Sequence, residues 1–233
     1  MTDQLLRNIE RLAAYTAEHP ELRVAHHFLY DLRVPKDGKP QFVVMGVNPG
    51  ETPHDWVIAP EPTEETSRYD FHDEVGAGRS AIRWSKAAQY FLSHADYVLA
   101  EIFFWSSYDS RIFRQRFGPV AKSRHLPICT DMNRDLINFY QPSAVVLPGL
   151  TYTRLVQQLY GLTHEESIKL NGVRVAERYS DGSRPWIFTK HWTAAFGFSR
   201  QQREVARNSI ADAMRSPNSS PLNCPVSVGL HKK

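Results

Sequence analysis

Four short apolar runs, separated by segments with a helical pattern, constrain the fold of this chain more than any other feature. Each run is nearly continuous in apolar residues, which is typical of strands that are covered on both faces. Because strands that alternate with helices form parallel sheets, we expect an α/β fold: a three-layer α/β/α sandwich around a short, mainly parallel four-stranded sheet. The expected strands cover residues 41–46, 97–104, 143–147 and 186–189. The expected helices cover residues 1–19, 80–95, 129–140, 151–160 and 199–214.

The length and composition of the chain suit one domain. With 233 residues, of which 42% are hydrophobic, the chain can bury a full-sized core. We expect a single domain at residues 1–215 and a disordered tail at residues 216–233, because the tail is rich in Ser, Pro and Asn. Residues 51–78 form a long connection with prolines, acids and glycines, and a structureless loop of that length is usually functional or disordered.

Cysteine number, histidine spacing and hydropathy bear on cofactors and compartment. The two cysteines, Cys129 and Cys224, are too few for a cysteine-rich metal or iron–sulfur site, and we expect no disulfide framework. No apolar run is long enough to span a membrane, and the first residues lack the apolar core of a signal peptide, so we expect a cytoplasmic protein. We expect neither a metal nor another cofactor, because four histidines match no standard ligand spacing: His26, His27, His54 and His72.

Basic residues gather in two segments that contain no acid, although the net charge is only +3. Such runs are either solvated surface or a footprint for phosphates, and the sequence leaves both readings open. The first segment, residues 110–130, contains Arg111, Arg114, Arg116, Lys122 and Arg124. The second, residues 184–203, contains Arg184, Lys190, Arg200 and Arg203.

The first expected strand runs into Gly46-Val47-Asn48-Pro49-Gly50. Asn48 precedes a proline, which disfavours the helical region and keeps its backbone extended. Pro49 and Gly50 fit the central pair of a type II turn, because proline fixes its own φ and glycine supplies a positive φ. Ligands of open α/β sheets bind outside the carboxyl ends of the strands, so Asn48 is either a candidate site residue or part of a simple turn.

The last expected strand runs into a second polar group, Lys190, His191 and Trp192. In a parallel sheet this strand end lies on the same edge as Asn48. Two polar groups that come together from distant parts of a chain indicate a site more strongly than either alone. Ser199 is a good N-cap for the last expected helix, and a helix N-terminus next to a basic residue, here Arg200, suits a phosphate.

These motifs resemble those of the uracil-DNA glycosylase superfamily, which has an α/β/α sandwich around a short parallel sheet. Residues 46–50 match the Gly-x-Asn-Pro-Gly motif of its mismatch-specific and single-strand-selective branches. Residues 190–199 are similar in position and order to its last motif, in which a histidine and then a small hydroxyl residue precede an intercalating loop. Residues 144–150, an apolar strand that ends in glycine before a helix, also resemble the family pattern.

The chain departs from the family pattern at two places. His191-Trp192-Thr193 stands where the family usually has His-Pro-Ser. Glu101 falls where several branches place an asparagine that reads the uracil edge. An ionised carboxylate only accepts hydrogen bonds, so it can accept from uracil N3–H but repels O4, and it suits an amino-bearing base better. The alternative is that Glu101 pairs with an arginine and touches no base.

The resemblance implies a role for each candidate residue. Asn48 is expected to hold the attacking water, and His191 to donate to the base oxygen O2. An amide is a poor base, so positioning and electrostatics carry the rate unless Glu51, Asp55 or Glu101 acts as the base. The base-binding candidates are Gly46, Val47, Glu101, Trp56 and Phe71. The DNA-binding candidates are Lys190, Trp192, Thr193, Phe196 and Arg200.

The leading hypothesis is a monomeric, metal-free DNA glycosylase that initiates base excision repair. It flips uracil, or another deaminated base, out of single- or double-stranded DNA and hydrolyses the N-glycosidic bond. Phe196 is favoured as the wedge over Phe198, which suits a hydrophobic staple at the helix start. One alternative keeps the fold as a non-catalytic binding module for DNA or a nucleotide. Another is an unrelated α/β hydrolase that acts on small nucleosides. Base preference and strand preference stay open.

Overall fold

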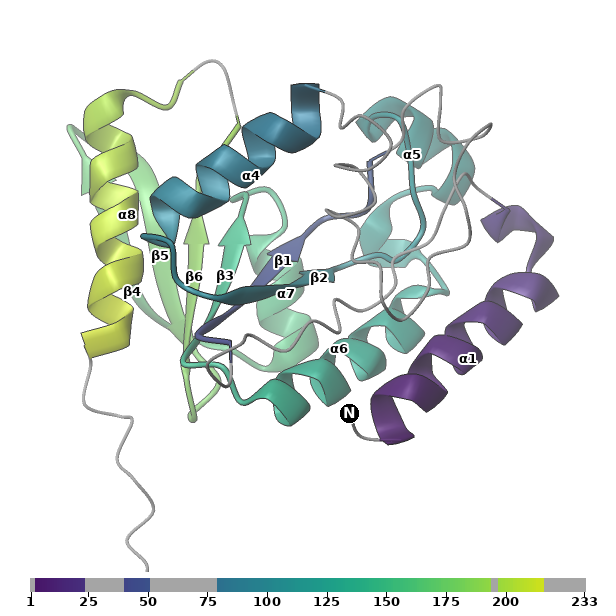
Figure 1. The fold of residues 1–233 in the computed structure, drawn as a ribbon. Coiled ribbons are helices and arrows are strands. Elements are labelled where there is room, and N and C mark those ends of the chain that lie inside the picture. Colours follow the sequence, from purple (N-terminus) through teal and green to yellow (C-terminus); the bar gives the residue numbers. More distant parts are fainter. Residues whose placement is uncertain (1–2, 24–39, 51–78, 194–196, 216–233) are drawn as a thin grey trace, which may run out of the picture.

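The structure, a computed structural model, describes residues 3–23, 40–50, 79–193 and 197–215, and these form one mixed sheet between helices (Figure 1). The strands lie in the order β2-β1-β3-β6-β5-β4. The first four pair in parallel, and the last two extend the sheet in antiparallel fashion. The parallel strands are β2 (Tyr97–Glu101), β1 (Phe42–Gly46), β3 (Ala144–Pro148) and β6 (Pro185–Thr189). The antiparallel pair is β5 (Val173–Ser180) and β4 (Thr163–Leu170).

The expected α/β fold class is confirmed, but the expected four-stranded, mainly parallel sheet is wrong. The described residues form a mixed sheet of six strands. The hairpin of β4 and β5 escapes a search for apolar runs because β4, with the sequence THEESIKL, is almost entirely exposed. Its turn does carry a sequence signal: Asn171 and Gly172 have φ values of 51° and 77°, and Asn-Gly is the preferred pair for a two-residue hairpin turn.

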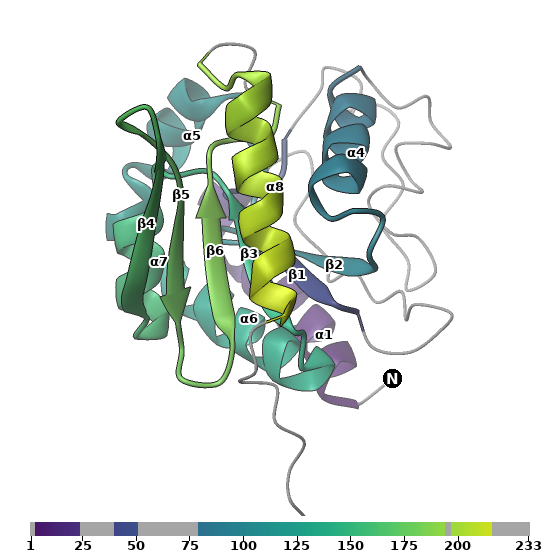
Figure 2. The ribbon, with the colours of Figure 1, turned by 90° about the vertical axis from the view of Figure 1, so that its left-hand side faces the viewer.

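The helices cover both faces of the sheet (Figure 2). On one face α8 packs against β5, β6 and β3, with α4 beside it. On the other face α6 packs against β2 and α1, and α7 lies beside α6. None of the helices in the described ranges is long and apolar enough to cross a membrane. The two layers are α4 (Arg79–Phe91) with α8 (Arg200–Arg215), and α1 (Asp3–Glu18) with α6 (Leu126–Tyr140) and α7 (Thr153–Tyr160).

A further short helix, α5 (Ser110–Phe117), lies in the first basic segment, where no helix is expected from the periodicity. Its ends are set by local chemistry. Asp109 caps the start, because its Oδ1 accepts a hydrogen bond of 2.8 Å from the backbone nitrogen of Ile112. Gly118 ends the helix with a φ of 69°, a conformation that favours glycine. The segment that follows contains the 3-10 turn η2 (Val120–Lys122) and then α6.

The core lies between the sheet and the two helical layers. Burial of a valine, leucine or phenylalanine side chain stabilises a fold by about 1.5–3 kcal/mol, so these strands hold the layers together. The central strands contribute side chains with no exposed surface, among them Val43, Val44, Val145, Val146 and Ile187.

Cys129 lies on α6 within this core and has no exposed surface. Its Sγ is 3.4 Å from the carbonyl oxygen of His125, one helical turn earlier, to which it donates. Burial desolvates the thiol and raises the pKa of Cys129 to about 12. Because the thiolate is the reactive form, Cys129 is inert at neutral pH.

We expect Cys129 to resist alkylation in the folded protein. In a Cys224→Ser variant, iodoacetamide at about pH 8 should label no thiol until denaturant is added, since thiolate formation is suppressed by burial. Mass spectrometry measures the labelling. The control is Asn138→Cys in the same background, because position 138 is an exposed position of the same helix. Native-state labelling of Cys129 as fast as that of the control thiol contradicts the buried position.

Candidate functional site

The carboxyl ends of the parallel strands meet at one edge of the sheet. Gly46 of β1 lies opposite Glu101 of β2, and Pro148 of β3 lies opposite Thr189 of β6. β1 stands between β2 and β3, so the chain leaves β1 toward one side of the sheet and later returns on the other side. Such a reversal of strand order is a topological switch point, where open α/β sheets bind their ligands.

The structure brings the two predicted catalytic residues to this edge. Asn48 lies two residues after β1, and His191 lies two residues after β6. β3 stands between these strands, so the ends of β1 and β6 are about 10 Å apart, which is two strand spacings. Gly149 follows β3 at the centre of the edge with a φ of 153°, and a Cβ atom there would have open space within 4 Å. Among the described residues, the position that follows β3 therefore contributes no side chain to the edge.

The amide of Asn48 is held in one orientation. Its Nδ2 donates to the carbonyl oxygen of Pro49 at 2.9 Å, to Oγ of Ser107 at 2.9 Å and, more weakly, to the carbonyl oxygen of Trp105 at 3.4 Å. Carbonyl oxygens only accept, so the nitrogen must face them, and this fixes the position of Oδ1. Within the described residues no hydrogen bond occupies Oδ1. Asn48 therefore has a fixed acceptor to offer.

The backbone after β1 pairs with the backbone after β2. The nitrogens of Ile102 and Phe103 donate to the carbonyl oxygens of Gly46 and Val47, each at 2.9 Å. Farther along, the nitrogen of Ser107 donates to Pro49 at 3.0 Å, and Gly50 forms a parallel bridge with Ser107. The strand pairing thus continues past the edge of the sheet. Sequence reasoning missed Ser107, although two serines after an apolar run are a weak signal for a polar strand end.

Gly46 and Glu101, two predicted base-binding residues, lie in contact. Glu101 is buried, with 6% of its surface exposed, and its carboxylate lies over the Cα of Gly46. A Cβ atom on Gly46 would be only 2.2 Å from Oε2 of Glu101. Asn133 on α6 fixes the end of β2, because its Nδ2 donates to the carbonyl oxygen of Glu101 at 2.8 Å. The carboxylate can occupy this position only because residue 46 has no side chain.

His191 lies exposed at the end of β6, and its Nδ1 is 3.1 Å from Oγ1 of Thr193. Partial desolvation of the ring lowers the pKa of His191. The lowered pKa favours a neutral imidazole at neutral pH, and a neutral imidazole has one nitrogen that donates and one that accepts.

Two other predicted DNA-binding residues, Lys190 and Arg200, lie on either side of the same loop. The Nζ of Lys190 donates to the carbonyl oxygen of Gly197 and, at 3.1 Å, to Oε1 of Gln202, so this side chain ties the loop to α8. Arg200 is exposed at the first position of α8. Ser199 caps that helix, since its Oγ accepts from the backbone nitrogen of Gln202 at 3.2 Å. Of the two cations, Arg200 faces solvent at a helix N-terminus.

Trp192 is part of the core in this structure. Only 1% of its surface is exposed, and its ring stacks on Phe91 of α4 at 5.0 Å between centroids. Its Nε1 donates to Oγ1 of Thr189 at 3.0 Å. The ring of Phe198 also stacks on Phe91, at 5.7 Å between centroids. Both rings anchor the loop that follows β6, and we therefore leave Trp192 out of the proposed DNA contacts. Five further candidates lie outside the described residues: Glu51, Asp55, Trp56, Phe71 and Phe196.

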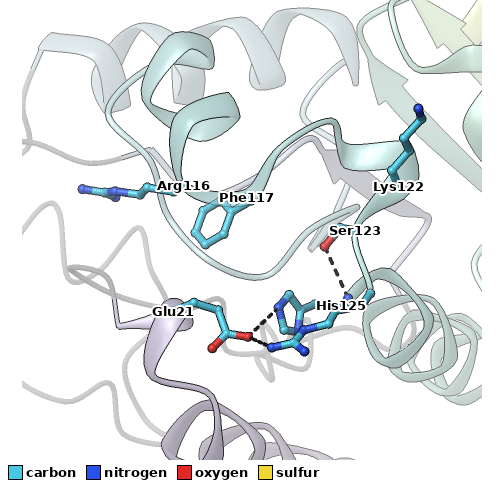
Figure 3. A pocket seen from close by; sticks show the side chains of 7 residues that line it. Glu21, Arg116, Phe117, Lys122, Ser123 and His125 are labelled. Atoms are coloured by element: carbon cyan, nitrogen blue, oxygen red, sulfur yellow. Dashed lines mark hydrogen bonds and ion pairs between the residues drawn. The ribbon is translucent and has the colours of Figure 1, made fainter.

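The first basic segment borders a pocket of about 430 Å³ (Figure 3). Three cations of that segment line it, and Glu21 and His125 lie on its wall. Glu21 belongs to the 3-10 turn η1 (Pro20–Leu22), which sequence reasoning missed. The lining residues are Glu21, Arg116, Phe117, Lys122, Ser123, Arg124 and His125.

No protein-family model matches the chain, and no curated protein matches it significantly. What bears on function is therefore the arrangement at the sheet edge and the motif at residues 46–50.

We expect Gly46→Ala to lower the free energy of unfolding by about 1–3 kcal/mol, because the added methyl group occupies the position of the Glu101 carboxylate. In a Glu101→Ala background the methyl group has room, and the cost of Gly46→Ala should fall by at least about 0.5 kcal/mol. Urea denaturation of the four proteins of this double-mutant cycle measures the difference. An equal cost in both backgrounds would show that the two residues do not compete for space.

Proposed function

We propose that this chain is a DNA glycosylase that acts as a monomer and hydrolyses the N-glycosidic bond of uracil in DNA, the first step of base excision repair. The observation that carries the proposal is the fixed amide of Asn48 at the switch point, on the same sheet edge as His191. The chemistry needs a positioned water, a donor to the departing base and a route to the flipped nucleotide.

Asn48 supplies the water position. Its Nδ2 is engaged by Pro49 and Ser107, so its Oδ1 can accept a hydrogen bond from water without the side chain turning away. An amide does not remove a proton efficiently at neutral pH. The rate therefore rests on holding the water against the anomeric carbon while positive charge develops on the sugar.

His191 supplies the donor. As the bond breaks, negative charge develops on the base, and a hydrogen bond to O2 stabilises it. A Thr193 hydroxyl that donates to Nδ1 places the ring proton on Nε2, from which it is donated to the base. The lowered pKa of His191 keeps the ring neutral, and a neutral ring is sufficient for this role.

Glu101 bears on which base is accepted. Its carboxylate lies against Gly46, at the point where β1 leads into the Asn48 loop. A carboxylate at the base edge accepts from N3–H of uracil or from an amino group, and it disfavours a base that presents only oxygen there. A test of substrates should therefore include hypoxanthine, xanthine and mismatched thymine beside uracil.

A second candidate function, a binding module without turnover, is favoured by one observation. The loop after β6 is anchored by Trp192 and Lys190 to the core and to α8, where the resembling family usually has a proline after its histidine. Such a loop can bind DNA without performing chemistry. Bond cleavage separates the two functions.

Asn48→Ala and His191→Ala are expected to reduce cleavage of a uracil-containing oligonucleotide by about 100-fold or more, because one removes the group that positions the water and the other the donor to the developing negative charge. Single-turnover cleavage, developed with alkali, measures the rate. Matched controls are Asn138→Ala and His164→Ala, which change exposed residues on α6 and β4 and should leave the rate unchanged. Wild-type protein that binds but cleaves none of the four bases supports the binding module instead.

Arg200→Ala is expected to weaken DNA binding and to reduce the slope of log Kd against log salt concentration by about 1, since one phosphate contact is lost. Fluorescence anisotropy with a labelled oligonucleotide at several salt concentrations measures both. Arg215→Ala is the control, because Arg215 is an exposed arginine at the opposite end of α8. An identical slope for Arg200→Ala and wild type removes the N-terminus of α8 from the interface.

A further inference from the structure

A second group of polar side chains lies away from the sheet edge. His19 and Glu21 lie in and next to η1, directly after α1, and His125 precedes α6, so two distant parts of the chain meet here. One possible ligand atom from each residue lies within 4.8 Å of the other two. Nε2 of His125 is 3.3 Å from Oε1 of Glu21, and Figure 3 shows these two side chains pointing toward one another at the pocket. We call His19, Glu21 and His125 the histidine cluster.

Tyr15 orients both imidazoles of this cluster. Nδ1 of His19 lies 2.8 Å from the carbonyl oxygen of Tyr15 and must donate to it, because a carbonyl only accepts. A neutral His19 ring therefore carries its lone pair on Nε2. Nδ1 of His125 lies 3.0 Å from the hydroxyl of the same tyrosine, which leaves Nε2 facing Glu21. Holding the remote nitrogen of each imidazole is how proteins orient histidines that bind metals.

Packing keeps the rings in place. His19 stacks on the Tyr15 ring at 4.1 Å between centroids, and it meets His125 edge-on at 5.3 Å. His125 is buried, with 5% of its surface exposed, and Trp105 packs against it at 5.7 Å. The two imidazoles and the carboxylate are thus close to one another before any ion arrives, and this lowers the ordering cost of binding.

We propose that the histidine cluster binds a divalent transition-metal ion through Nε2 of His19, Nε2 of His125 and the carboxylate of Glu21. Two imidazoles and one carboxylate form a ligand set that zinc adopts at sites with an open position. Glu21 and His125 line the pocket of about 430 Å³, so the open position borders it. Arg116 and Lys122 also line the pocket, with their side chains directed away from Glu21 and His125 (Figure 3). The site does not depend on the proposed glycosylase activity.

One charged neighbour opposes a cation at the cluster. Arg124 pairs with Oε1 of Glu21 and competes with an ion for it. The Arg124 side chain is 71% exposed, so it can leave Glu21 at little cost in stability.

Isothermal titration of the metal-stripped full chain with Zn²⁺ tests the site, in a Cys224→Ser background that removes a competing thiol. We expect one ion per chain, and a loss of affinity of at least about 10-fold in His19→Gln and in Glu21→Gln, which change partly exposed residues. Tyr15→Phe, which removes the hydroxyl that holds His125, should weaken binding by about 10-fold. His94→Gln and His164→Gln are matched controls, because both histidines are exposed and outside the cluster.

Arg124→Gln should change the affinity for zinc in the opposite direction. Because it removes the competitor for Glu21, this variant should bind Zn²⁺ several-fold more tightly than the parent protein. Co²⁺ substitution gives a second readout, the visible absorption of a four- or five-coordinate ion, which the Glu21→Gln variant should lose. Zinc binding that is absent in the parent, or unchanged in both His19→Gln and Glu21→Gln, overturns the proposal. Weaker binding in Arg124→Gln overturns it as well, since that result makes the arginine a support of the site.

Discussion

The backbone pairing between the chain after β1 and the chain after β2 is the constraint on which the rest of the structure depends. Gly46, Val47 and Pro49 each accept a hydrogen bond from the facing segment, so two loops behave as an extension of two buried strands. A side-chain hydrogen bond from Asn48 to Ser107 joins the same two segments. Without this pairing, the turn after β1 would have the freedom of an ordinary loop, and its asparagine would have no fixed direction.

Trp105 connects the two candidate sites through this paired segment. Its carbonyl oxygen accepts from Asn48, while its ring packs against His125 and its Nε1 donates to Oγ1 of Thr16. One residue of a buried segment thus supports the sheet-edge site with its backbone and the histidine cluster with its side chain. A shift of Trp105 would disturb both sites together.

The sequence predicted the parallel strands and their polar ends, because buried parallel strands read as apolar runs and their carboxyl ends share an edge. It did not predict β4, whose exposed side chains form no such run, nor the histidine cluster. His19 and His125 are distant in the chain and have no local spacing to recognise, so only the packing of α1 against α6 brings them together. Trp192 illustrates a third limit. An aromatic residue at a strand exit suits both a core and a DNA contact, and here Trp192 is in the core because it packs against α4.

The hairpin of β5 and β4 changes the position of β6 within the sheet. Without it, β6 would be the outermost strand, and the strand that leads to His191 would present unpaired backbone groups to any passing chain. With it, β6 is flanked on both sides by β3 and β5, and the outer position belongs to β4. The outermost strand carries exposed charges at Glu165, Glu166 and Lys169, and charged side chains oppose strand addition by a second molecule. The hairpin therefore protects the strand that ends at the proposed site from edge-to-edge aggregation.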